Sequence, residues 1–148
     1  MNARMNYGKV APEPPEADVR AGGVPPRVRA RTRLLERVKT RVSQINGCAF
    51  CLDMHTQDAR AAGETEQRLY LLSAWREAPF YSDRERAALA WAEALTRLDG
   101  VPDEVYEDVR GHFTEKELVD LTYAVVAING WNRLAISFRA VPGTYKPR

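Results

Sequence analysis

The sequence predicts an all-α protein, a single-domain bundle of about six helices. Apolar residues recur at helical spacing along most of the chain after residue 31. Two segments begin with the Ser/Thr-x-x-Glu pattern of a helix capping box. No stretch alternates apolar and polar residues as a half-buried strand does, and no βαβ rhythm appears. A chain of 148 residues has the length of one domain and can bury a sizeable core.

The N-terminal segment, residues 1–31, is predicted to be irregular and rich in proline, glycine and arginine. Residues 12–26 alone contain five prolines and two glycines, which disfavour a long regular helix. Residues 1–41 carry ten lysines and arginines against four acidic residues. No aromatic residue interleaves with the arginines and no nucleic-acid motif surrounds them, so we expect a solvated or intersubunit surface and no nucleic-acid partner.

The helical domain is expected to span residues 32–141, followed by a C-terminal tail at 142–148. Its first helix covers residues 32–45, where the apolar residues at helical spacing are Leu34, Leu35, Val38, Val42 and Ile45. Asn46-Gly47 is a pair that tolerates the left-handed conformation, so the helix should end there. A second helix should begin close to Cys48 and run to Ala62, before Gly63.

Four further helices are expected, with the bounds Thr65 to about Arg76, Ser82 to Leu98, Pro102 to about His112, and Thr114 to Phe138. Capping boxes open the second and the fourth of these. Pro102 suits the first turn of a helix. In the last segment Gly130 indicates a bend or a close helix crossing, and the capped start favours helix for its β-branched residues.

The chemistry of the chain is concentrated in a Cys-x-x-Cys pair at the start of the second helix. Cys48 and Cys51 are the only cysteines, and His55 follows four residues later. Positions i, i+3 and i+7 share one helix face. The N-terminus lacks the apolar stretch of a secretory signal, and no apolar run approaches the roughly 20 residues that span a bilayer. We therefore expect a cytoplasmic protein without a membrane span, in which the pair is catalytic or metal-binding.

A thiol at a helix N-terminus is stabilised as a thiolate by the free N–H groups and the helix dipole. His55 could accept the thiol proton, and a carboxylate would orient its imidazole. Asp53 is adjacent in sequence but points to the opposite side of the helix. Glu36 lies on the preceding helix, which a hairpin at Asn46-Gly47 would fold back over the second helix. Helix position favours Cys48 as the more acidic thiol.

The pattern Glu36, eleven residues, Cys48-x-x-Cys51, three residues, His55 resembles the signature of the alkylhydroperoxidase D branch of the carboxymuconolactone decarboxylase superfamily. The resemblance runs from about residue 34 to 138. It implies an all-α fold, a homo-trimer or hexamer, and no metal or organic cofactor. It also implies that Cys51 attacks a small hydroperoxide, that Cys48 resolves the sulfenic acid as a disulfide, and that His55 and Glu36 relay protons. An external dithiol, from a lipoylated or thioredoxin-like protein, would restore the thiols.

The sequence departs from the family pattern at two places, and three alternative functions remain open. Relatives can carry a second histidine between the cysteines, where this chain has Phe50, and they have a regular helix where this chain has residues 14–30. Zinc held by both cysteines and His55, with Glu36 or His112, is one alternative. A second alternative is a redox sensor that does not turn over a substrate. The third is a cofactor-free decarboxylase, although the name-giving decarboxylases of the superfamily act without a cysteine pair. The segment Trp131-Asn132-Arg133 is a further candidate for lining the site, because polar residues inside an apolar run need partners.

Overall fold

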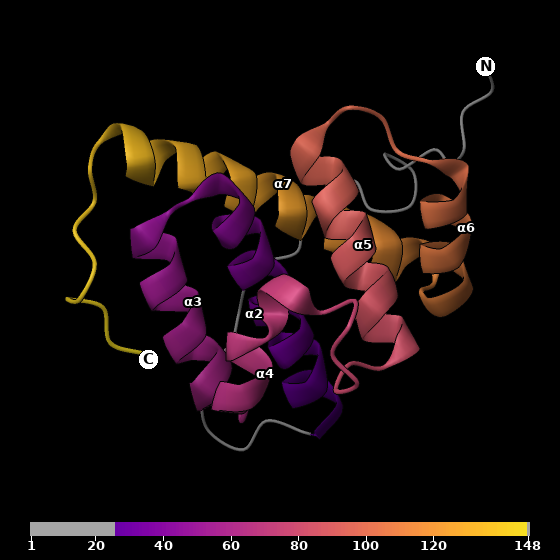
Figure 1. Cartoon of the computed structure of the whole chain (residues 1–148), viewed down its shortest axis with the longest axis horizontal. Helices are drawn as coiled ribbons and strands as arrows, with labels where there is room; N and C mark the ends of the chain where they lie inside the picture. The colour runs from indigo at the N-terminus through magenta and orange to yellow at the C-terminus, as the bar shows by residue number, and fades with distance from the viewer. Residues whose placement is uncertain (1–25, 148) are drawn as a thin grey trace.

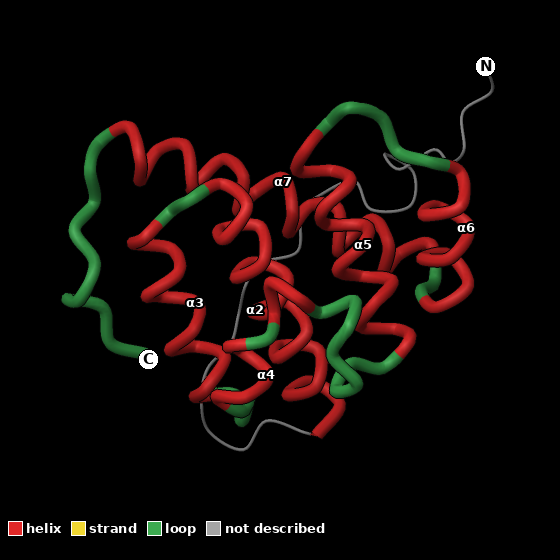
Figure 2. Tube along the Cα trace, viewed as in Figure 1, coloured by secondary structure: helices red, strands yellow, loops and turns green. Residues whose placement is uncertain are grey.

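The computed structural model describes residues 26–147, with side chains from residue 31 onward. Within this range all the regular elements are helices, joined by loops, and no strand occurs, as Figure 2 shows. Six α-helices and one 3₁₀ helix follow one another: α2 (Pro26–Asn46), α3 (Ala49–Ala61), α4 (Glu66–Tyr70), η1 (Leu72–Ala74), α5 (Asp83–Arg97), α6 (Asp103–His112) and α7 (Glu115–Ser137). The predicted all-α class is confirmed. No helix among these is long and apolar enough to span a bilayer.

The first described helix begins earlier than expected. It starts at Pro26, whereas the sequence predicted an irregular segment up to residue 31. Proline has its fixed φ and lacks a donor, which suits the first turn of a helix, so Pro26 can open α2. Arg31 then reaches across to α7, where its guanidinium donates to Asp120 over 2.9 Å. The rest of the predicted irregular segment, residues 1–25, lies outside the described residues.

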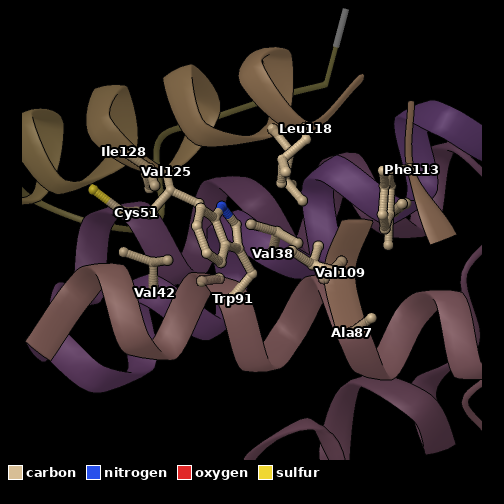
Figure 3. Close-up of a cluster of buried hydrophobic side chains, with 14 of the residues drawn as sticks. Val38, Val42, Cys51, Ala87, Trp91, Val109, Phe113, Leu118, Val125 and Ile128 are labelled. Atoms are coloured by element: carbon tan, nitrogen blue, oxygen red, sulfur yellow. The ribbon is translucent and has the colours of Figure 1, made fainter. Parts of the chain in front are cut away.

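Helix α2 occupies the middle of the bundle and packs against α3, α5 and α7 (Figure 1). Its buried apolar residues Val38 and Val42 meet Trp91 of α5 and Val125 of α7 in the main core, which Figure 3 shows. Both cysteines belong to this same core. The cysteine pair is therefore part of the packing that stabilises the fold, where burial of apolar surface contributes about 25 cal/mol for each Å².

The turn between α2 and α3 follows the prediction. Gly47 has φ of 71°, in the left-handed region that glycine enters without steric cost. The chain then reverses, and α3 runs back along α2 (Figure 1). This antiparallel hairpin sets the register between Glu36 on one helix and His55 on the other.

The predicted helix from Thr65 to Arg76 is broken. It forms α4, then the short 3₁₀ turn η1. Arg86 of α5 contacts the end of this segment, where its guanidinium donates to the carbonyls of Trp75 and Arg76 over 3.0 and 3.1 Å. Those carbonyls are satisfied from α5 and do not need a continuing helix. The Trp75 indole also donates to buried Glu93 over 2.9 Å.

The remaining helices form as expected, with one exception in α7. Capping boxes open α5 at Ser82 and α7 at Thr114. The β-branched residues of α7 are helical, but Gly130 is exposed and a Cβ added there would meet no atom within 4 Å. The close crossing expected at Gly130 is therefore wrong. Beyond α7 the tail turns back to α3, where the Gly143 amide donates to Asp53 over 2.7 Å (Figure 1).

Replacing Gly47 with alanine should destabilise the protein by about 1 kcal/mol, because a Cβ is disfavoured in the left-handed conformation. Gly111→Ala is the matched control, since Gly111 lies in α6 without a positive φ and with open space around it. That change should be neutral or stabilising by up to roughly 1 kcal/mol. Urea unfolding followed by circular dichroism measures both. Equal stability of the two variants would contradict the assignment of Gly47.

Candidate active site

Cys48 is the N-cap residue of α3. Its amide donates to the Ser43 carbonyl over 3.0 Å, which ties it to the last turn of α2. Its sulfur accepts the backbone N–H of Cys51 over 3.4 Å, so the sulfur takes the place of a capping oxygen. The expected position at a helix N-terminus is thus found, and the free N–H groups of the first turn lie beside the thiol.

The two cysteine sulfurs lie in contact. Both residues are free thiols, with 1% of each residue exposed, and the Sγ atoms are 2.6 Å apart. Figure 3 shows the Cys51 side chain beside Val125 and Ile128 of α7. Because the sulfurs already face each other, a disulfide between them needs little movement of the backbone.

His55 and Glu36 form a buried hydrogen-bonded pair across the α2–α3 hairpin. The distance from His55 Nδ1 to Glu36 Oε2 is 2.7 Å, and both residues are 6% exposed. Lys39 donates to the other Glu36 oxygen, also over 2.7 Å. The expected partnership of Glu36 with His55 is therefore present in the structure. When Nδ1 donates its proton to the carboxylate, Nε2 is left as the basic nitrogen.

Electrostatics keep Glu36 ionised. Burial alone would raise the pKa of this carboxyl, but the hydrogen bond from His55 and the charge of Lys39 outweigh it, so the pKa lies below its ordinary value. The carboxylate can therefore orient the imidazole and stabilise a positive charge on it.

The pKa of the Cys51 thiol is shifted in the opposite direction, upward. Burial, together with the neighbouring Cys48, raises the pKa of Cys51 to about 11, while a hydrogen bond from Asn132 acts against the rise. The sequence led us to expect thiols made more acidic by the helix N-terminus. At Cys51 burial outweighs that effect, so the resting residue is a neutral thiol and needs a base to become nucleophilic.

The other acidic residues of α3 have separate partners. Asp53 faces away from the thiols, as expected, and binds Gln57 and the Gly143 amide. Asp58 was not anticipated: it lies near His55 and accepts the Tyr145 hydroxyl over 2.7 Å. Burial first, and the charge of Glu36 as well, raise the pKa of Asp58. Tyr145 lies 87 residues away in the sequence, so no local signal could have indicated the contact.

Among the described residues, a potential cation site groups Glu36, His55 and Asp58, whose ligand atoms lie within 4.8 Å of one another. Neither cysteine belongs to this group. Lys39 already donates a hydrogen bond to the Glu36 carboxylate, and Tyr145 donates one to the Asp58 carboxylate. His112, the other suggested ligand, faces Asp108 within α6. The zinc site that combined both cysteines with His55 is not assembled by this arrangement.

Asn132 is the buried residue of the apolar segment, and its side chain hydrogen-bonds to Ser43 and Asn46 of α2. It is 0% exposed and lies on the buried face of α7. Trp131 points outward with 63% exposed, and Arg133 donates to the Asn129 carbonyl on the surface. Phe50, between the cysteines, packs against the main core. The helical spacing of buried Leu121, Val125 and Ile128 extends to Asn132, so the sequence held a signal for its burial.

The family model for the carboxymuconolactone decarboxylase family matches residues 16–94 of the chain. The chain belongs to this family. An uncharacterized relative, YdfG of Bacillus subtilis (strain 168), is 47% identical over 141 residues, which cover 93% of this chain and 95% of YdfG. Membership agrees with the helical fold and with the paired thiols at the start of α3.

Similarity to two solved structures places this chain in the alkylhydroperoxidase D-like branch of the family. One is ATU0492 of Agrobacterium tumefaciens, a protein of unknown function described as a candidate antioxidant defence protein AhpD. It is 38% identical to this chain. Its TM-score is 0.74, and the match covers 97% of this chain and 100% of ATU0492. The other is an uncharacterized peroxidase-related protein from Silicibacter sp. TM1040, 27% identical, with a TM-score of 0.68 over 76% of this chain and 60% of that one.

The alkylation rate of Cys51 in the reduced protein should rise about tenfold per pH unit between pH 7 and 9. The thiolate is the reactive form, and a pKa of about 11 keeps its fraction small throughout this range. Peptide-resolved mass spectrometry after short exposure to iodoacetamide measures the rate at each pH. A plateau reached below pH 8.5 would contradict the raised pKa.

Proposed function

We propose that the protein is a thiol-dependent peroxidase that reduces small organic hydroperoxides through the Cys48–Cys51 pair. The observation that carries this proposal is the contact of two free thiols, one turn of α3 away from an imidazole oriented by a buried carboxylate. A pair of thiols in contact suits a cycle between dithiol and disulfide. The name-giving decarboxylases of the superfamily act without such a pair.

In the first step, His55 Nε2 accepts the Cys51 proton, and the thiolate attacks the terminal oxygen of the hydroperoxide, the one that carries the hydrogen. The O–O bond breaks, Cys51 becomes a sulfenic acid, and the proton passes to the departing alkoxide to give an alcohol. Glu36 stabilises the transient imidazolium through its 2.7 Å contact with Nδ1. Both cysteines are 1% exposed, which favours small hydroperoxides over bulky ones.

In the second step, the Cys48 sulfur attacks the sulfenic sulfur, a disulfide forms and water leaves. The 2.6 Å separation of the two sulfurs supports this step. Each turnover then consumes two electrons from an external dithiol, which attacks the disulfide and regenerates both thiols. We propose a lipoylated or thioredoxin-like protein as that reductant, in the reducing environment of the cytoplasm.

We also propose that the protein is a homo-oligomer. Its resemblance to trimeric and hexameric relatives supports assembly, and α7 offers a surface for it. Exposed apolar residues follow one another along and beyond the outer side of this helix: Val126, Trp131, Leu134, Phe138 and Val141. Exposed apolar surface of this kind is typical of subunit interfaces. Light scattering should give a molar mass of three or six chains, and a mass of one chain would contradict the proposal.

The function is tested by intact mass after reduction, addition of one equivalent of cumene hydroperoxide and alkylation of the remaining thiols. The wild-type protein should lose both alkylation sites, and a dithiol should restore them. Cys51→Ser should abolish peroxide consumption. Cys48→Ser should stop at a sulfenic acid on Cys51 that dimedone traps, because no second thiol can resolve it.

Two histidine variants test the relay in the same assay. His55→Gln should slow peroxide consumption by roughly a hundredfold or more, the contribution of a positioned general base. His112→Gln is the matched control and should leave the rate unchanged, because His112 lies on α6 and faces Asp108. Two alkylated thiols in peroxide-treated wild-type protein would contradict the function. Dimedone on Cys48 in the Cys51→Ser protein would reverse the two cysteine roles.

A further inference from the structure

The C-terminal tail is joined to α3 by two hydrogen bonds, and carboxylates of that helix accept both. The Gly143 amide donates to Asp53, and the Tyr145 hydroxyl donates to Asp58, each over 2.7 Å. Figure 1 shows the tail beside α3. Among residues 141–147 Tyr145 is half-buried, whereas the others are exposed. The tail therefore presents one side chain to α3, and the hydroxyl of that side chain meets a carboxylate.

Asp58 lies beside the His55–Glu36 pair. It follows His55 by three residues on α3, and residues at this spacing are neighbours on the surface of a helix. A carboxylate oxygen of Asp58, a carboxylate oxygen of Glu36 and a ring nitrogen of His55 all lie within 4.8 Å of one another. The imidazole therefore has a second carboxylate close by, in addition to the one that it contacts over 2.7 Å.

Each of the two carboxylates has a hydrogen-bond donor of its own. Lys39 donates to Glu36 over 2.7 Å, and the tail supplies the Tyr145 hydroxyl to Asp58. With both carboxylates ionised, two negative charges face the single positive charge of Lys39. The group as a whole then carries one negative charge while the imidazole is neutral. It becomes neutral when His55 accepts a proton, so the surrounding charges favour the imidazolium form.

Tyr145 favours the charged form of Asp58. Burial first, and the charge of Glu36 as well, raise the pKa of Asp58. The hydrogen bond from Tyr145 and the charges of His55 and Lys39 act against that rise. A carboxylate that accepts a hydroxyl proton is stabilised as the anion and is held in one orientation. The tail thus acts on the charge beside the imidazole through Asp58.

We propose that Asp58 is a positioning residue that stabilises the imidazolium form of His55, and that Tyr145 holds its carboxylate in place. The inference rests on the proposed function in one respect, that His55 is the base that takes the thiol proton. Glu36 orients the ring through Nδ1, and Asp58 adds a second negative charge within 4.8 Å. Because these charges are fixed by hydrogen bonds, they need no rearrangement when positive charge appears on the ring.

The test is the titration of His55, followed by NMR of its ring protons, in wild-type protein and in Asp58→Asn. Asparagine keeps the shape of the side chain and an oxygen for Tyr145 but removes the charge. The pH midpoint of the His55 titration should fall by about half a unit to one unit, because the imidazolium loses a nearby negative charge. The chain has two histidines, and His112 on α6 serves as the internal reference, with an unchanged midpoint.

Two further variants separate the tail from the carboxylate, with urea unfolding to confirm that each one folds. Tyr145→Phe should lower the His55 midpoint by a smaller amount, since it removes the hydrogen bond and leaves the carboxylate. Asp53→Asn is the matched control, because Asp53 accepts the other hydrogen bond from the tail but faces away from the thiols and binds Gln57. It should leave the midpoint unchanged.

Three outcomes of these titrations would overturn the proposal. One is a wild-type midpoint in folded Asp58→Asn. Another is an equal fall in Asp53→Asn, which would assign the effect to any carboxylate of α3. The third is a wild-type midpoint in folded Tyr145→Phe, which would remove the part assigned to the tail.

A measurement on the wild-type protein covers the case in which the Asp58 variant does not fold. The ¹³C resonance of the Asp58 carboxyl group should shift over the pH range in which the His55 ring becomes protonated, and His55→Gln should abolish that shift. An Asp58 resonance that ignores the His55 titration would overturn the proposal.

The same variants are then compared as peroxidases. Asp58→Asn should lower the plateau rate of peroxide consumption by roughly two- to tenfold, because a less basic imidazole accepts the thiol proton less readily. The acid limb of its pH profile should move to lower pH, together with the His55 midpoint. Asp53→Asn should keep both the rate and the profile of the wild-type protein.

The titration contains no peroxide, so the two proposals can fail separately. A lowered midpoint in Asp58→Asn, together with wild-type protein that consumes no peroxide, would leave Asp58 as the residue that stabilises the imidazolium and remove the peroxidase function. Wild-type peroxide consumption in folded Asp58→Asn, with an unchanged midpoint, would remove the role of Asp58 and leave the peroxidase.

Discussion

The reversal of the chain at Asn46-Gly47 is the constraint on which the site depends. Gly47 adopts φ of 71°, and α3 consequently returns along α2 in one fixed register. That register brings Glu36 to His55, nineteen residues later, at a distance of 2.7 Å. The same turn places Cys48 at the N-cap of α3. One backbone conformation thus positions the carboxylate, the imidazole and both sulfurs, and any other turn would separate them.

Burial raises the pKa of both Glu36 and Cys51, yet the net pKa shifts of the two groups have opposite directions. Glu36 is buried yet keeps its charge, because His55 and Lys39 both donate to it and lower its pKa. Cys51 is buried without a cation among the causes that act on its pKa, which lies at about 11. The resting site therefore contains an ionised carboxylate and a protonated thiol. This is the charge distribution that a relay requires if the proton is to leave the sulfur only when substrate is present.

Features that depend on neighbours in the sequence could be predicted, and features that depend on distant ones could not. The hairpin, both capping boxes and the pairing of Glu36 with His55 follow from local spacing and turn residues. The break after α4 was missed because the predicted helix from Thr65 to Arg76 contains no glycine or proline to mark it. The helical start at Pro26 was missed because a proline-rich composition outweighed the single position where proline is well tolerated.

Asn132 shows where sequence reasoning on this chain stops. Its spacing from Leu121, Val125 and Ile128 places it on the buried face of α7, and that much can be deduced from a helical period. A buried amide must find partners, but the period cannot say which residues they are. Here they are Ser43 and Asn46, because α7 packs across the end of α2 where α3 begins. The Cys-x-x-Cys spacing identifies the candidate thiols, whereas the hydrogen bonds that join α7 to the end of α2 beside them depend on how a distant helix packs.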